Sequence, residues 1–301
     1  MKKKTKVFLD FTSMTHPIKG KQHKTRIAKA LNKLYKTKYK KVKIKYTGKS
    51  MKRYFDSYKF EFINTNRKNF KVTISINPID ITNNFFRVQL NPRAAGSKGV
   101  IRTYKLLCKV LGKNTAKKLY FESPLTRIDI TFDVFGLKKP YYAYVDGMTT
   151  SEIKPGDNGR FTQVIGKGHV RLSVYDKTEE EDQHPGKSPA AFIHPNHFRY
   201  EFCLRNLRYP LSDLVNKTRN PFLKLRIYNA KFLTDNYFDD TFIQQVQLEG
   251  LNKAIHELPT DAKKRRYKRR LNKLYQAKWF DPEKVWKDWL QATTIFDAWH
   301  S

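Results

Sequence analysis

Three stretches near the middle of the chain alternate between apolar and polar residues: Thr126–Val134, Arg171–Lys177 and Phe198–Leu204. Successive side chains of a strand point to opposite faces, so this period of two predicts three amphipathic β-strands. If the strands share a sheet, one face belongs to the core. The other face, here called the polar face, carries Arg127, Asp129, Thr131, Asp133, Arg171, Ser173, Tyr175, Lys177, Arg199, Glu201, Cys203 and, one step on, Arg205. This polar face is the candidate active site.

Other periodic stretches predict further elements around these strands. Period two predicts strands at Lys6–Thr12, Tyr58–Phe62, Phe70–Ile76 and Phe86–Leu90, with Asn64–Asn69 closing a hairpin. Helical spacing of apolar residues predicts helices at about Lys21–Tyr39 and Gly99–Lys118, and a helical signal from Leu207 to the end. Two loops are expected, Val145–Arg160 with short strands and the acidic Glu179–Pro195. This order indicates the α+β class, with a largely antiparallel central sheet flanked by helices.

The C-terminal part is predicted to be a basic helical region. We expect residues 1–250 to form a catalytic domain and residues 251–301 a DNA-binding region. Thr260-Asp261 is typical of a helix N-cap, and Asp281-Pro282 of the start of a last helix. The first of these helices places Tyr267, Leu271, Leu274 and Tyr275 on one face and eight basic residues between Lys263 and Lys273 elsewhere. The candidate DNA contacts among them are Lys264, Arg265, Arg269 and Arg270, although a solvated helix face is the alternative reading.

The net charge of the chain limits the classes of partner that the protein can have. Lys and Arg together number 61 against 27 Asp and Glu, so the chain of 301 residues carries a formal charge of +34. Such a chain works beside a polyanion, and nucleic acid is the commonest one. An anionic membrane is the rival, but no apolar run has the length of a spanning helix, and Lys2-Lys3-Lys4 does not begin a signal peptide.

Apolar content and cysteine usage exclude two other classes. With 39% hydrophobic and 14% aromatic residues, the chain can form a core, so wholesale disorder is not expected. Cys108 and Cys203 fit reduced thiols in the cytoplasm better than a disulfide framework or a zinc site.

The acidic residues of the polar face suggest a metal site. Asp129 and Asp133 are four residues apart, about 13 Å along an ideal strand, so they do not share one ion without a bulge. Asp129 and Glu201 stand on different strands and could share one, because neighbouring strands lie about 5 Å apart. Oxygen ligands of this kind suit Mg²⁺ or Mn²⁺. The alternative is that Asp129, Asp133 and Glu201 form cross-strand salt bridges with the DNA-contact candidates of the same face, Arg127, Arg171 and Arg199, and with Arg205.

Tyr175 and Lys177 are the candidate catalytic pair. Most tyrosines in strands serve packing, but Tyr175 falls on the polar row, with Ser173 and Lys177 two residues to either side. A phenol has a pKa near 10, so a nucleophilic one needs positive charge or a base beside it. Lys177 and a metal ion supply that charge, and the same cations stabilise a phosphate in its transition state. The combination favours attack of a tyrosine on a DNA phosphodiester.

Three segments resemble the rolling-circle replication initiators: Thr126–Asp133, with the sequence TRIDITFD, then Tyr175-Asp176-Lys177, then Arg199-Tyr200-Glu201-Phe202. The likeness covers about Pro124–Leu207 and is closest to the plasmid initiators of the Rep_trans type and the gene II proteins of filamentous phages. It implies an enzyme that nicks one strand at an origin, stays joined to the 5′ phosphate and frees a 3′ hydroxyl. Tyr175 would be the nucleophile, Asp129 and Glu201 would belong to a Mg²⁺ or Mn²⁺ site, and Asp133 is a further candidate ligand.

The resemblance also implies partners. These are double- and single-stranded origin DNA and a host helicase and polymerase in the cytoplasm of a bacterium. The sequence leaves open whether the protein forms a homodimer. No His-hydrophobic-His triplet occurs, which departs from the best-known initiators and fits the Rep_trans and gene II types.

Two alternatives use the same residues differently. A non-enzymatic nucleic-acid-binding protein would use the polar face only as an electrostatic platform, and a relaxase or transposase would apply the same tyrosine chemistry to another substrate. The overall charge is equally compatible with all of them. Covalent attachment to DNA separates an enzyme from a binder.

Overall fold

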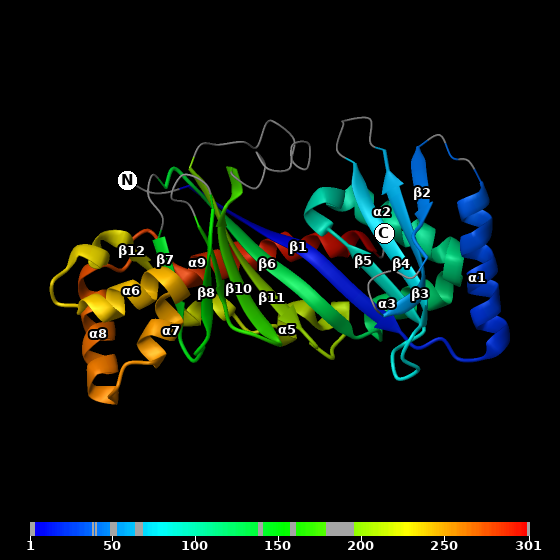
Figure 1. Cartoon of the computed structure of the whole chain (residues 1–301). Coiled ribbons are helices and arrows are strands. Elements are labelled where there is room, and N and C mark those ends of the chain that lie inside the picture. The colour runs from blue at the N-terminus through cyan, green and yellow to red at the C-terminus, as the bar shows by residue number, and fades with distance from the viewer. Residues whose placement is uncertain are drawn as a thin grey trace. The chain divides into compact units, whose positions relative to one another are not determined.

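The predicted strands and helices assemble into an α+β fold, seen here in a computed structural model (Figure 1). It describes residues 4–37, 39, 41–48, 53–63, 69–137, 141–156, 161–178 and 196–299. The strands are β1 Lys4–His16, β2 Val42–Tyr46, β3 Tyr54–Phe62, β4 Phe70–Pro78, β5 Phe86–Leu90, β6 Leu125–Phe135, β7 Tyr141–Val145, β8 Ser151–Pro155, β9 Phe161–Ile165, β10 Val170–Asp176, β11 His197–Arg205 and β12 Leu225–Asn229. The α-helices are α1 Lys21–Lys36, α2 Pro92–Leu111, α3 Lys113–Phe121, α5 Leu214–Lys217, α6 Asp240–Glu249, α7 Leu251–His256, α8 Asp261–Leu274 and α9 Pro282–Thr293.

Ten of the described strands hydrogen-bond in the order β2-β3-β4-β5-β1-β6-β11-β10-β9-β8, and β12 pairs with β7. The three stretches with alternating residues are β6, β11 and β10, which are consecutive neighbours in this order. The prediction that they share a sheet is therefore confirmed. Of the described helices, none is long and apolar enough to cross a membrane.

The chain divides into two compact units that are interleaved along the sequence. Unit 1 comprises Met1–Val7, Thr131–Cys203 and Asn220–Trp289, and unit 2 comprises Phe8–Ile130, Leu204–Arg219 and Leu290–Ser301. Residues 251–289 thus belong to the same unit as residues 220–250.

Unit 2 covers one face of its strands with helices. Tyr58 of β3 donates a hydrogen bond from its hydroxyl to Oδ1 of Asn32 in α1, at 2.7 Å. In α2, a Cβ added at Gly99 would meet the ring of Phe70 of β4 at 3.1 Å, so the absence of a side chain allows helix and strand to approach closely. The apolar residues on this face are buried: Met14, Tyr58, Phe60, Phe70, Val72, Ile74, Phe86, Val88 and Leu90.

The helix expected at Gly99–Lys118 begins earlier and is interrupted, by a non-helical kink at Gly96 and by the end of α2 at Gly112. Oδ1 of Asn91 accepts a hydrogen bond from the backbone N–H of Ala94 at 2.8 Å, and Pro92 occupies the first turn, so α2 starts at Pro92. Gly112, with φ of 86°, ends α2 and precedes α3. A left-handed residue stops a helix, and glycine adopts that conformation at the lowest cost.

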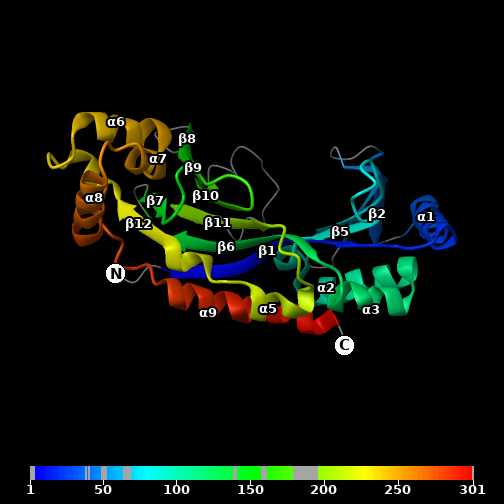
Figure 2. The same cartoon turned by 90° about the horizontal axis from the view of Figure 1, so that it is seen from below.

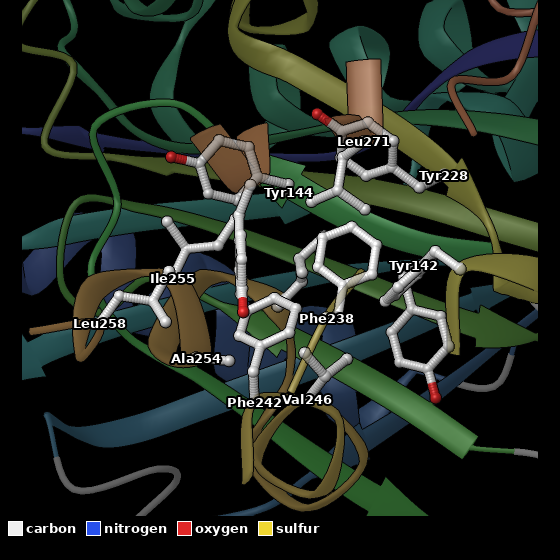
Figure 3. Packing of buried hydrophobic residues seen from close by; sticks show 13 residues of the cluster. Tyr142, Tyr144, Tyr228, Phe238, Phe242, Val246, Ala254, Ile255, Leu258 and Leu271 are labelled. Atoms are coloured by element: carbon white, nitrogen blue, oxygen red, sulfur yellow. The ribbon is translucent and has the colours of Figure 1, made fainter. Parts of the chain in front are cut away.

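In unit 1, helices α6, α7 and α8 lie beside the β7–β12 pair (Figure 2). Their side chains form a buried cluster rich in aromatic residues. Phe238 and Phe242 lie close together in this cluster (Figure 3). The ring centroid of Phe238 is 5.5 Å from that of Phe242 and 4.9 Å from that of Tyr267. Asn252 of α7, buried, accepts a hydrogen bond from the N–H of Val145 and donates one to its carbonyl, at 3.0 and 2.8 Å. These contacts hold the helices against β7.

Sequence reasoning was partly wrong past Leu207. The stretch 225–229 is the strand β12 and not a helix, because it pairs with β7 from Leu225↔Val145 to Asn229↔Tyr141. The N-cap predictions are confirmed: Thr260 Oγ1 accepts the N–H of Lys263 at 3.2 Å, and Asp281 Oδ1 accepts that of Glu283 at 3.0 Å. Leu274, expected on the buried face of α8, is half exposed in the last turn.

Candidate active site on strands β6, β11 and β10

The apolar rows of the three strands are buried as predicted. Ile128, Ile130, Phe132 and Val134 of β6 have no exposed surface, and Leu172 and Val174 of β10 are buried. In β11 the buried row is Phe198, Tyr200, Phe202 and Leu204. The remaining positions therefore form a second face.

The register of β6 against β11 follows from two backbone hydrogen bonds. The N–H of Asn206 donates to the carbonyl of Thr126 at 3.0 Å, and that of Gly136 donates to the carbonyl of Asn196 at 3.1 Å. In unit 1, the second bond sets Asp133 opposite Arg199 and Thr131 opposite Glu201. Such pairs lie between the hydrogen bonds of an antiparallel ladder, where side chains approach most closely. The stacked rings of Phe132 and Tyr200, with centroids 4.6 Å apart, agree with this register.

Asp133 and Arg199 form a buried, two-pronged ion pair. Arg199 donates from Nε to Oδ1 at 2.7 Å and from Nη2 to Oδ2 at 2.9 Å. His197, the residue before Phe198, brings Nε2 to 3.1 Å from Oδ2 of Asp133. The side chain of Asp133 has no exposed surface, and Arg199 and His197 are 6% and 2% exposed. The polar face is therefore closed to solvent around Asp133. His197 also lies on this face, which the sequence pattern did not predict.

Asp129, in unit 2, is also engaged by an arginine. Arg127, two residues earlier on the same strand, donates from Nε to Oδ1 at 2.8 Å and from Nη2 to Oδ2. The Asp129 side chain is 5% exposed and that of Arg127 is 30% exposed. The guanidinium of Arg127 also lies 4.7 Å from the ring centroid of Phe11 in β1. Asp133 thus pairs with an arginine of the neighbouring strand, whereas Asp129 pairs with an arginine of its own strand.

Tyr175 lies on β10, whose burial alternates. Leu172, Val174 and Asp176 are buried, whereas Arg171, Ser173 and Tyr175 are half-buried. β10 ends at Asp176, so Lys177 follows the strand, and its side chain is buried. Glu201 of β11 is half-buried. Tyr175, Arg171 and Glu201 are thus partly accessible side chains on neighbouring strands of unit 1.

Tyr200, the other tyrosine of these strands, lies in a different environment from Tyr175. Tyr200 is buried on the apolar row, and among the described residues its hydroxyl has no hydrogen-bond partner. Burial raises the pKa of Tyr200 far above its usual range. A phenol whose ionisation is opposed by burial and that is closed to solvent is unsuited to nucleophilic attack.

The described carboxylates of the polar face are not arranged as a metal site. Within the described part of the chain, no group of three or more His, Cys, Asp or Glu side chains is arranged to hold an ion. Both carboxylate oxygens of Asp129 and of Asp133 already accept hydrogen bonds from arginine. A divalent cation at either aspartate would therefore have to displace a guanidinium.

The basic residues of α8 divide into two groups. Arg270 donates from Nε to Oδ2 of Asp235 at 2.9 Å, and Lys264 lies 3.6 Å from Oδ1 of Asp261. Arg265 and Arg269 are exposed and, with Lys268, Asn272 and Lys273, line a shallow hollow along one side of the helix. Two of the four predicted DNA contacts therefore face solvent, and Arg270 packs within the unit.

Comparison with protein-family models and with curated proteins finds no match for this chain.

Proposed function

We propose that this protein is a rolling-circle replication initiator that nicks one strand of an origin through Tyr175. The observation that supports this best is the adjacency of β6, β11 and β10, which brings the three resembling segments into one sheet. Those segments lie far apart in the chain, so their adjacency was a condition of the hypothesis. The formal charge of +34 supports a DNA substrate.

In this proposal the hydroxyl oxygen of Tyr175 attacks the phosphorus of a phosphodiester. A bond forms between that oxygen and the 5′ phosphate, while the bond from phosphorus to the 3′ oxygen breaks. The phenol proton leaves to solvent or a base, and the 3′ oxygen takes up a proton to become a free hydroxyl. Lys177 and Arg171 contribute positive charge, which favours both the phenolate and the charge that develops on the phosphate.

A divalent metal ion held through Glu201 would add Lewis-acid stabilisation of the phosphate oxygens when bound. Asp133 has a different role in this proposal. Its buried pair with Arg199 fixes the facing positions of β6 and β11. The pair thereby holds the neighbouring position, Glu201, in place.

A non-enzymatic DNA-binding protein is the second candidate. The observation that favours it is that Asp129 and Asp133 both form ion pairs with arginines. Carboxylates that are neutralised in this way do not serve as catalytic acids, and the sheet as a whole remains basic. The same tyrosine chemistry in a relaxase or transposase is a third possibility, which the DNA flanking the gene would distinguish.

The deciding experiment is incubation of the protein with Mg²⁺ and supercoiled DNA that carries its own coding region. Nicked circles with protein joined to the 5′ end of the break would support the initiator. Intact supercoiled DNA that is nevertheless bound and retarded in a gel would support the binder.

A further inference from the structure

Unit 2 carries a second polar sheet face, on strands that hold none of the candidate catalytic residues. The registers of β2, β3, β4 and β5 alternate between two sets of side chains. One set is apolar and packs under α1 and α2, as Tyr58 and Phe70 illustrate. The other set points away from those helices. It includes Lys43, Lys45, Phe55, Lys59, Lys71, Thr73 and Gln89.

One row of this second face carries charges of a single sign. Lys45 stands directly opposite Lys59, and the same row continues through Thr73 and Gln89 without a carboxylate. In the next row Glu61 stands between Lys43 and Lys71, with Lys71 Nζ 3.9 Å from its carboxylate. Like charges directly opposite each other on a sheet destabilise it. An anion bound between the two lysines would relieve such a repulsion.

An aromatic ring lies on the same face. Phe55 of β3 is two residues before Ser57 and four before Lys59, so it shares their side of the sheet, and it is 47% exposed. Surfaces that bind single-stranded nucleic acid combine cations along the backbone with exposed rings on which bases stack. A duplex offers phosphates to the lysines but no unpaired base to the ring.

We propose that this face, Lys45 and Lys59 with Phe55, binds single-stranded DNA. The lysines contact phosphates, and the ring of Phe55 stacks on an unpaired base. The inference goes beyond the proposed function because it requires no cleavage. It is tested in the Tyr175→Phe background, so the loss of nicking and the loss of strand binding are measured separately.

The first test compares two variants of equal charge. Lys45→Gln/Lys59→Gln removes two charges from this face, and Lys105→Gln/Lys113→Gln removes two exposed charges from α2 and α3 of the same unit. Fluorescence anisotropy with a labelled oligo-dT strand is recorded over a series of salt concentrations. Each lost phosphate contact lowers the log–log salt slope by about 0.7 for a single strand. In the first variant the log–log salt slope should become less steep by about 1.4, and the affinity near 0.1 M salt should fall at least about ten-fold. The second should keep the parental slope.

The second test isolates the ring. Phe55→Leu should weaken binding of the labelled strand about ten-fold without changing the salt slope, because stacking carries no charge. It should leave binding of a hairpin duplex unchanged. Thermal unfolding serves as the folding control, and Lys45→Gln/Lys59→Gln should unfold no earlier than the parent because it removes a repulsion.

Three results would overturn the proposal. One is an unchanged slope in Lys45→Gln/Lys59→Gln, and another is an equal loss in the α2–α3 control. The third is an equal effect of Phe55→Leu on strand and duplex, which would indicate a duplex surface or a general polyanion surface. Early unfolding of the lysine variant would contradict the charge argument itself.

Discussion

Arg199 holds Asp133 by two hydrogen bonds, of 2.7 and 2.9 Å, in a part of the sheet from which water is excluded. The residues are 66 positions apart in sequence and directly opposite in the ladder of β6 and β11. Removing one member of such a pair leaves the other as an uncompensated buried charge.

Asp133→Asn should therefore lower the free energy of unfolding by about 3–5 kcal/mol. Asp129→Asn is the matched comparison, because its partner Arg127 is 30% exposed and can be solvated when the pair is lost. We expect about 1 kcal/mol or less for that variant. Urea unfolding of both variants measures the difference. Equal losses would mean that burial does not distinguish the two pairs.

Tyr175→Phe should abolish nicking and covalent attachment while DNA affinity and fold remain, since only a hydroxyl is lost. Tyr200→Phe is the control on the neighbouring strand. Its hydroxyl is buried without a partner among the described residues, so its removal should leave activity intact and stability unchanged or higher by about 1 kcal/mol. The measurement is mass spectrometry of the DNA-linked peptide after proteolysis. An adduct on a different tyrosine would refute the site assignment and keep the function. Full nicking by Tyr175→Phe without any adduct would refute the mechanism.

Glu201→Gln should remove cleavage and leave origin binding nearly unchanged if Glu201 holds a metal ion. Asp129→Asn tests, in the same assay, the aspartate that the sequence resemblance implies as a ligand. Comparison with Asp133→Asn distinguishes loss of the metal ion from loss of stability. Titration with Mn²⁺, followed by its paramagnetic signal, reports binding without cleavage. Full activity in EDTA would exclude the metal, and equal Mn²⁺ binding by the parent and by Glu201→Gln would exclude this ligand.

Arg265→Gln/Arg269→Gln should flatten the dependence of duplex affinity on salt. These side chains face solvent on α8, and each phosphate contact contributes a log–log slope of about −0.9 on a duplex. The slope should become less steep by about 1.8. Arg270→Gln is the internal contrast: Arg270 pairs with Asp235, so it should affect stability more than the slope. If the slope does not change in the double variant, phosphate contact lies elsewhere, with α1 as the next helix to test.

Acid should destabilise the helical cluster of unit 1. Hydrogen bonds from Arg270 and Tyr275 lower the pKa of Asp235 to about 2, and those from Lys263 and Tyr267 do the same for Asp239. A carboxylate whose folded pKa lies below its unfolded value of about 3.9 contributes stability above that value and loses it as pH falls towards 2. Unfolding followed by tyrosine fluorescence should show this loss between about pH 4 and pH 2. Asp235→Asn/Asp239→Asn should be less stable at neutral pH and should lack that part of the acid dependence.

The sequence determined the local features whose causes lie within a few residues. Alternation alone identified the buried rows of β6, β10 and β11, since period two in a strand separates two faces. Thr260 and Asp281 were identifiable as N-caps because a cap bonds to an N–H two or three positions on. The predicted antiparallel α+β class is confirmed for the same reason, because the elements that were predicted carry their own periodicity.

Tertiary structure decided everything that depends on register. That Asp133 faces Arg199 while Asp129 pairs with Arg127 follows from how β6 aligns with β11 and from side-chain direction, which no local pattern specifies. His197 joined the buried pair by the same alignment. The separation of Arg270, held by Asp235, from the exposed Arg269 depends on a loop 35 residues away. A strand, β12, was missed because five residues acquire their conformation from pairing with β7 and not from their own sequence.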